Sequence, residues 1–219
     1  TNCSFTNFES PNSNSTYHGL SSALTFYQSK IDIQKSLFFD NPSGDDYVNC
    51  FNSIFNFKNV TFKNIYADAI DSDFSSGKIT NSVFQHIGND AIDASGSHIS
   101  IENSKFIEIQ DKAVSIGEYS KSLVACNYFF NNSIGCAIKD GSETFFSKNL
   151  FVNNDLDIAI FQKKNFYSKN CTVKSDERID SLKYLIDSSI NLIYPRAAKL
   201  KKTDNVKELM YGVVYGKKS

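Results

Sequence analysis

Residues 67–88 read ADAIDSDFSSGKITNSVFQHIG, and residues 89–110 read NDAIDASGSHISIENSKFIEIQ. The two stretches align at an offset of 22 residues, so that Asp68-Ala69-Ile70-Asp71 recurs as Asp90-Ala91-Ile92-Asp93 and Phe84 recurs as Phe106. A fixed period of about 20 to 50 residues is typical of repeat architectures, in which one short structural unit stacks on the next. The sequence therefore predicts a repeat protein.

The same period continues in both directions from this pair. Further copies lie at 45–66, 111–133, 134–155 and 156 to about 176, and a longer, looser copy covers 18–43. The copy at 111–133 contains one extra residue. About seven copies therefore cover residues 1–175, and the tail 176–219 departs from the period.

Each unit is too short to hold two packed helices. Its apolar residues are β-branched and aromatic, they alternate with a period of two, and clusters of Gly, Asn, Ser and Asp separate the runs. This pattern describes one coil of a parallel β-solenoid, whose coils stack about 4.8 Å apart. The predicted fold class is all-β, a parallel β-helix of about seven 22-residue coils with a C-terminal capping tail.

Stacking of coils places equivalent residues in columns and so assigns their faces. Two columns are apolar or small enough to point inward: Ile70, Ile92, Val114, Cys136, Ile158, and Phe38, Phe62, Phe84, Phe106, Phe129 or Phe130, Phe151. A third column, Asn59, Asn81 and Asn103, predicts an Asn ladder at a turn, in which side-chain amides bond along the stack. The Phe column accounts for much of the content of 19 Phe.

Composition excludes several classes of protein. The formal net charge of −1 argues against a general nucleic-acid binder. The sequence contains no run of about 18 apolar residues, so it predicts no membrane-spanning helix. Five cysteines without a CxxC pair argue against a zinc site. The chain starts within a repeat and shows no signal peptide, so we expect a piece of a longer protein or a mature form. Its composition favours an extracellular or cell-surface location.

The tail combines several short signals. A strand-like run covers 184–194, a basic segment covers 196–202, and a short helix is expected at 205–212 with Asp204 as a candidate N-cap. Because the open end of a solenoid exposes unpaired strands, we expect this tail to cap that end.

Acidic residues gather on the predicted outer face. Asp68, Asp71, Asp73, Asp90 and Asp93 would crowd a patch about 10 Å across. Stacked like charges cost free energy, so some group should compensate them. Three candidates stand open: a bound cation such as Ca²⁺, the Lys112 ammonium one coil further, or turn N–H groups that bond the carboxylates.

The motifs NDAID-x-SGS at 89–97 and DKAVSIGE at 111–118 resemble the right-handed parallel β-helix (pectate-lyase-like) superfamily. Many of its members are polysaccharide lyases, hydrolases or epimerases that hold acidic glycans along an outer sheet. The resemblance implies a polysaccharide or cell-surface glycan as partner, with Lys112 and Asp90 as catalytic residues and Lys112 as the base that removes a proton from the substrate. It further implies Ca²⁺ bound by Asp68, Asp71 and Asp93, and a substrate groove lined by Asp73, Glu118, Lys139 and Asp140.

Other features depart from those enzymes. The run NDAID…DKAVSIGE looks like the NTDGID…GDDCIAI run of polygalacturonases, but Lys112 stands where their catalytic carboxylic acid stands, and Asp111 is left without its acidic partner. Hydrolysis by that mechanism is therefore not expected. The only arginines, Arg178 and Arg196, lie outside the repeats, which argues against an arginine-dependent lyase site on the sheet.

Two non-catalytic interpretations also fit the sequence. A rigid β-helix could bind a glycan without chemistry, through its acidic strip and exposed aromatic residues such as Phe51, Tyr119 and Phe161. Alternatively, the solenoid could be a stiff stalk or adhesin segment of a larger cell-surface or phage-type protein. Fold alone does not decide between these functions.

Overall fold

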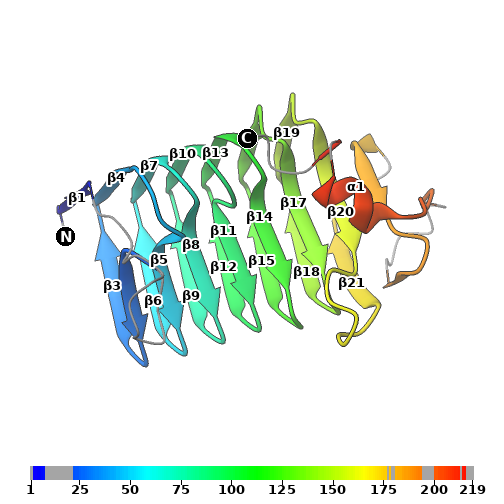
Figure 1. The fold of residues 1–219 in the computed structure, drawn as a ribbon, viewed down its shortest axis with the longest axis horizontal. Helices are drawn as coiled ribbons and strands as arrows, with labels where there is room; N and C mark the ends of the chain where they lie inside the picture. The colour runs from blue at the N-terminus through cyan, green and yellow to red at the C-terminus, as the bar shows by residue number, and fades with distance from the viewer. Residues whose placement is uncertain are drawn as a thin grey trace.

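A computed structural model describes residues 2–7, 22–176, 178, 181–193, 200–212 and 214–215. The chain forms a parallel β-helix whose strands make three sheets of seven, eight and eight strands (Figure 1). The predicted all-β solenoid of about seven coils is therefore confirmed. His18, part of the looser copy at 18–43 and most of the basic segment at 196–202 lie outside the described residues.

Each coil contributes one strand to each of the three sheets. Sheet A contains β1 (Ser4–Thr6), β4 (Leu37–Asn41), β7 (Thr61–Ile65), β10 (Val83–Ile87), β13 (Lys105–Ile109), β16 (Tyr128–Phe130) and β19 (Leu150–Val152). Sheet B contains β2 (Leu24–Tyr27), β5 (Asp46–Phe51), β8 (Asp68–Asp73), β11 (Ile92–Ser95), β14 (Lys112–Gly117), β17 (Ile134–Lys139), β20 (Leu156–Phe161) and β22 (Tyr184–Ile186). Sheet C contains β3 (Lys30–Gln34), β6 (Ile54–Lys58), β9 (Ser76–Thr80), β12 (His98–Glu102), β15 (Lys121–Ala125), β18 (Glu143–Ser147), β21 (Asn170–Ser175) and β23 (Asn191–Ile193).

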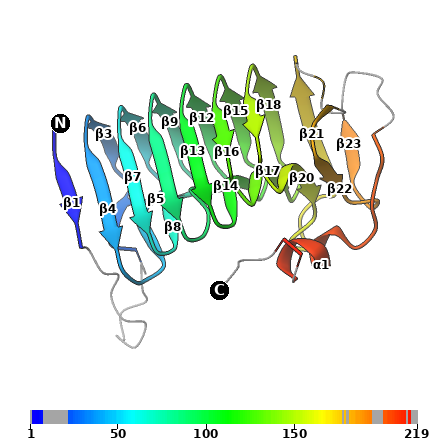
Figure 2. The ribbon, with the colours of Figure 1, turned by 90° about the horizontal axis from the view of Figure 1, so that it is seen from above.

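The strand register confirms the predicted core columns. Ile92 pairs with Ile70, and Phe84 pairs with both Phe62 and Phe106. Figure 2 shows the strands of sheet A stacked along the solenoid, from β1 and β4 through β7 and β13 to β16. Along sheet A the Phe rings stack face to face, with centroids 4.4 to 5.2 Å apart from Phe5 to Phe151. The spacing of the coils therefore sets the spacing of the rings, and each ring buries the next.

The polar ladders lie one residue away from their predicted place. Asn59, Asn81 and Asn103 have φ between 52° and 55° and exposed side chains, so they serve as left-handed turn residues. The ladder is formed by the residues that follow such turns: Ser82 N donates to Ser104 Oγ (3.1 Å), Ser104 N to Asn127 Oδ1 (2.9 Å), and Asn127 N to Asn149 Oδ1 (3.1 Å). These bonds satisfy backbone groups that no strand reaches.

The extra residue of the 111–133 copy sits at the corner between sheets B and C. Gly96 alone forms this corner in one coil, with φ 61°, whereas Glu118 and Tyr119 form it in the next, with φ 53° and 61°. Ser120 then resumes the ladder by accepting the Ser97 N–H at 2.9 Å. The corner absorbs the insertion, so the strands on either side keep their register.

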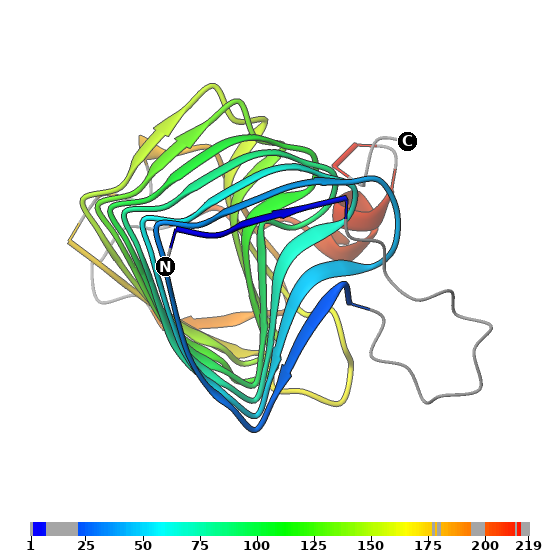
Figure 3. The same ribbon diagram turned by 90° about the vertical axis from the view of Figure 1, so that its left-hand side faces the viewer.

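The tail first continues the solenoid and then turns back along its side. Strands β22 and β23 extend sheets B and C by one further coil, but helix α1 (Val206–Tyr211) lies outside the solenoid, against sheet B (Figure 3). Its buried Val206 and Met210 pack in one apolar cluster with Leu156 and Phe161. Asp187 accepts the Val206 N–H at 3.1 Å, a role that we had predicted for Asp204. The tail thus covers a side of the solenoid.

This arrangement divides the outer face of sheet B in two. The acidic half lies over β5, β8 and β11 and presents Asn49, Asp71, Asp73 and Asp93. The covered half lies over β14, β17 and β20, under the tail, and its outward residues are buried: Ser115, Ile134, Ala137, Lys139, Leu156, Ala159 and Phe161. The prediction that Phe161 is exposed is therefore wrong, because α1 packs on its ring.

Candidate functional site

The first acidic column is a hydrogen-bonded ladder. Asp68 Oδ1 accepts the Asp90 N–H at 2.8 Å and the Asn89 amide at 2.5 Å, and Asp90 Oδ1 accepts the Lys112 N–H at 2.9 Å. Each carboxylate therefore satisfies a backbone donor of the following coil. Turn N–H groups, one of the three compensations considered for the acidic patch, account for these two Asp residues.

Lys112 supplies the second compensation. Its Nζ lies 2.5 Å from Asp111 Oδ2 and 3.4 Å from Asp90 Oδ1, and the side chain is almost fully buried. Burial lowers the pKa of the ammonium, but the two carboxylates outweigh it and hold the pKa well above its usual range. These surroundings favour a fixed ammonium ion over the base predicted at this position.

Asp90 has the titration behaviour that a proton-transfer group needs. Burial raises the pKa of Asp90 to about 6, although the Lys112 ammonium lowers it. A carboxyl group with a pKa near the working pH can both take up and release a proton. Of the two predicted catalytic residues, Asp90 is the one whose environment suits proton transfer.

Asp93 forms an ion pair that spans two coils. Lys139 Nζ lies 3.6 Å from Asp93 Oδ1, and its side chain reaches there by passing over Gly117, where an added Cβ would come within 3.2 Å of Lys139 Cε. Burial raises the pKa of Asp93, but Lys139 and Lys163 outweigh it and bring the pKa below its usual range. Asp93 therefore stays ionised beside Asp90.

Asp71 and Asp73 belong to a neighbouring group. The Asn49 amide donates to Asp71 Oδ2 at 2.8 Å and to Asp73 Oδ2 at 3.1 Å. Burial and the nearby Asp46 and Asp73 carboxylates raise the pKa of Asp71 to about 10. The predicted metal ligand Asp71 is thus protonated at neutral pH and turned toward Asn49.

The structure brings together a different acidic set from the predicted one. Asp68, Asp90 and Asp93 each place one carboxylate oxygen within 4.8 Å of the others. The spacing would suit a cation, but Lys112 and Lys139 already pair with Asp90 and Asp93, and Asp68 Oδ1 already accepts two hydrogen bonds. The donor set therefore fits Ca²⁺ poorly.

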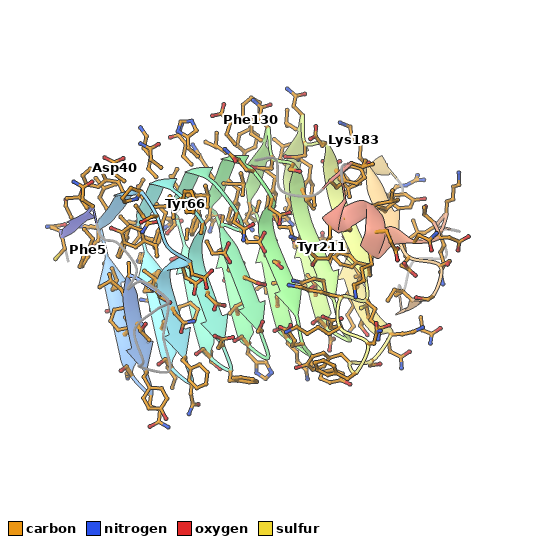
Figure 4. The ribbon with its side chains drawn as sticks, in the orientation of Figure 1. Phe5, Asp40, Tyr66, Phe130, Lys183 and Tyr211 are labelled. Atoms are coloured by element: carbon orange, nitrogen blue, oxygen red, sulfur yellow. The ribbon has the colours of Figure 1, made fainter. Side chains whose placement is uncertain are left out.

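One group of the site, Lys163, comes from the loop between β20 and β21, and another, Tyr211, comes from the tail beyond the repeats. A pocket of about 430 Å³ is lined by Asp68, Asp90, Asp93, Lys112, Lys163 and Tyr211, among others, and we call it the Asp–Lys pocket. The Tyr211 ring on α1 (Figure 4) lies 5.5 Å from Lys112 Nζ and 5.7 Å from Lys163 Nζ, measured to its centroid. Neither Lys163 nor Tyr211 was predicted as a site residue, because the repeat pattern places no functional column at either position.

Three predicted substrate-binding residues have partners within the protein. Asp140 Oδ1 accepts the backbone N–H groups of Lys163 and Lys164, at 2.7 and 2.9 Å, and Glu118 Oε1 pairs with Lys164 Nζ at 2.5 Å. Glu118, Lys139 and Asp140 are all buried. The Asp140 and Glu118 carboxylates hold the segment after β20 in place, and Lys139 pairs with Asp93. These three residues therefore support the pocket through other residues and do not line it. Asp73, the fourth, is bound to Asn49.

Comparison with protein families gives one match. The family model described as "Right handed beta helix region" matches residues 68–194, more than half of the 219-residue chain. Neither the curated proteins nor the solved structures include a match. Within the described residues, no helix has the length and apolar character needed to cross a membrane.

Proposed function

The chain belongs to the right-handed β-helix family, and we propose that it binds a carbohydrate, a segment of an acidic polysaccharide, in the Asp–Lys pocket. The observation that carries this proposal is the meeting of carboxylates, ammonium groups and one partly exposed aromatic ring, Tyr211, in a single pocket. Polar groups of both signs can hydrogen-bond sugar hydroxyls, and an aromatic ring can cover the apolar face of a sugar.

The charges of the pocket support an acidic ligand. Lys112 and Lys139 are each paired with Asp carboxylates, whereas Lys163 forms no ion pair with a carboxylate of any described residue. Its ammonium group is therefore available to a carboxylate of the ligand, as in a uronic acid. A charge-assisted hydrogen bond of this kind is roughly twice as strong as a neutral one.

Cleavage of the bound polysaccharide is a second candidate function. Asp90, with a pKa of about 6, lies beside Asp93, whose pKa is below its usual range. Two carboxyl groups held in different protonation states are the arrangement that acid–base catalysis uses. In this reading Asp90 transfers the proton, Asp93 remains charged, and Lys112 contributes a fixed positive charge.

A panel of uronic-acid polysaccharides tests both candidates. Binding is measured by calorimetry and cleavage by the absorbance of unsaturated products, each with and without a chelator. We expect Lys163→Ala and Tyr211→Ala to weaken binding about tenfold, which corresponds to about 1.4 kcal/mol. The matched control is Lys121→Ala, which removes an exposed lysine of sheet C and should leave binding unchanged.

Several outcomes of this panel would overturn the proposals. Absence of binding across the whole panel would remove the carbohydrate proposal and favour a stalk or adhesin segment. Binding without product would remove only the cleavage candidate. Loss of binding on addition of the chelator would restore the predicted Ca²⁺ site.

A further inference from the structure

Three lysine side chains meet around the Asp–Lys pocket, and they differ in their partners. Lys112 is held by Asp90 and Asp111, and Lys139 is held by Asp93. Lys163 lines the pocket itself and contacts the Tyr211 ring, with no carboxylate of the described residues in ion-pair contact. Of these three lysines, Lys163 is therefore the one whose ammonium form is not stabilised by an ion pair with a carboxylate of the described residues.

The position of Lys163 is fixed by its backbone. Its N–H donates to Asp140 Oδ1 at 2.7 Å, directly after β20, so the side chain starts from a defined point beside Lys139. The Lys139 ammonium, and then burial, lower the pKa of Lys163; Lys112 acts in the same direction, while Asp93 and Asp90 oppose it. An amine next to a second, permanently charged ammonium is a known form of activated nucleophile.

The neighbouring Lys164 provides an internal comparison. Its Nζ lies 2.5 Å from Glu118 Oε1, and this hydrogen bond raises its pKa. Two adjacent lysines thus have opposite pKa shifts, because the Lys139 ammonium acts on Lys163 whereas the Glu118 carboxylate contacts Lys164. At any given pH a larger fraction of Lys163 is the free amine.

We propose that Lys163 is a nucleophilic amine that condenses with small hydroxy-aldehydes entering the Asp–Lys pocket. The amine nitrogen attacks the carbonyl carbon, the π electron pair moves to oxygen, and a proton passes from nitrogen to that oxygen to give a carbinolamine. Asp90, which lines the same pocket, protonates the hydroxyl group, loss of water leaves a protonated imine, and this imine returns its N–H proton to the Asp90 carboxylate. The step consumes no oxidant or reductant, and the polar lining suits the hydroxyl groups of the aldehyde.

Reductive trapping tests this proposal on the full chain. The protein is incubated with glycolaldehyde and cyanoborohydride between pH 7 and 8, and peptide mass spectrometry compares alkylation at Lys163 and Lys164. We expect Lys163 to react several-fold faster, because a larger fraction of it is the free amine at a given pH. Exposure cannot produce this result, because the Lys164 side chain is 41 % exposed and lies outside the pocket. Equal rates, or faster reaction at Lys164, would overturn the proposal.

A variant and a pH profile separate activation from mere access. Lys139→Met removes the neighbouring positive charge, so we expect the rate at Lys163 to fall several-fold, toward that at Lys164. In the unaltered protein, the rate at Lys163 should reach its plateau at a lower pH than the rate at Lys164. This second measurement remains decisive if Lys139→Met does not fold, and coincident pH profiles would contradict the proposal.

Discussion

The acidic half and the covered half of sheet B are built from equivalent strands of successive coils and share the same inward columns, but their outer surfaces differ. The outward column that reads Asp71 and Asp93 on the acidic half continues as Ser115, Ala137 and Ala159 on the covered half. Because the coil repeats fix only the inward residues, the outer face can change from one coil to the next. Small and apolar residues appear where the tail docks, and the Asp–Lys pocket forms at the boundary.

Removal of the Lys112 ammonium group, which lies between the two halves, should have the largest effect on the stability of the protein. Lys112→Met leaves Asp90 and Asp111 as buried carboxylates without their partner, and breaking such a pair costs about 4 kcal/mol. We expect this loss in the free energy of unfolding at pH 7, measured by urea denaturation. At pH 5 the loss should shrink, because Asp90, with a pKa of about 6, is then protonated. An equal loss at both pH values would show that Asp90 is not the affected group.

A substitution on the covered half should weaken the packing of helix α1 against sheet B. Phe161→Ala removes a fully buried ring from the cluster with Val206 and Met210, and we expect it to cost about 3 kcal/mol. Limited proteolysis should then cut near α1 first. The matched control is Phe145→Ala on sheet C, where the ring is 42 % exposed and the cost should be below about 1 kcal/mol. Equal costs would mean that the tail does not protect Phe161.

The acidic half should respond to pH in the opposite sense from an ordinary surface carboxylate. The pKa of Asp71 is raised from 3.8 to about 10, so the folded state binds more protons than the unfolded state between these values. Its contribution to stability is therefore complete below about pH 4 and is lost as pH rises toward 10.

Asp71→Asn removes this titration and gives the smallest effect of the three. We expect equal stability at pH 4 and a gain of about 1 kcal/mol at pH 8, a modest value because Asp71 is partly exposed. Urea midpoints at the two pH values provide the measurement. A loss of stability at pH 8 would show that the ionised carboxylate is favourable where it lies.

Sequence periodicity could predict the solenoid because the core repeats with the backbone. Phe84 and Phe106 occupy equivalent positions in consecutive coils, so a period in the sequence becomes a column in space. The same argument placed Asp68, Asp90 and Lys112 in one column and Asp71 and Asp93 in another. Register, faces and the crowding of the acidic patch all follow from local spacing.

The parts that sequence could not predict depend on contacts between distant segments. Nothing in the period brings Tyr211 to Lys112, since α1 lies outside the repeats and reaches sheet B through its own apolar residues. One signal was present: Ala137, Ala159 and Phe161 are apolar at outward positions, which indicates a covered surface. The burial of Lys139 follows from the same cover, and its pairing with Asp93 depends on the absence of a side chain at Gly117.

The corner between sheets B and C lengthens along the chain. It is formed by Gly96 in one coil, by Glu118 and Tyr119 in the next, and after β20 by the segment 162–169, which carries Lys163. Strand pairing continues undisturbed on both sides of each of these corners. This corner therefore accepts insertions without a change in the strand pairing. Evolution or protein engineering can add side chains beside sheet B at this position while the β-helix keeps its dimensions.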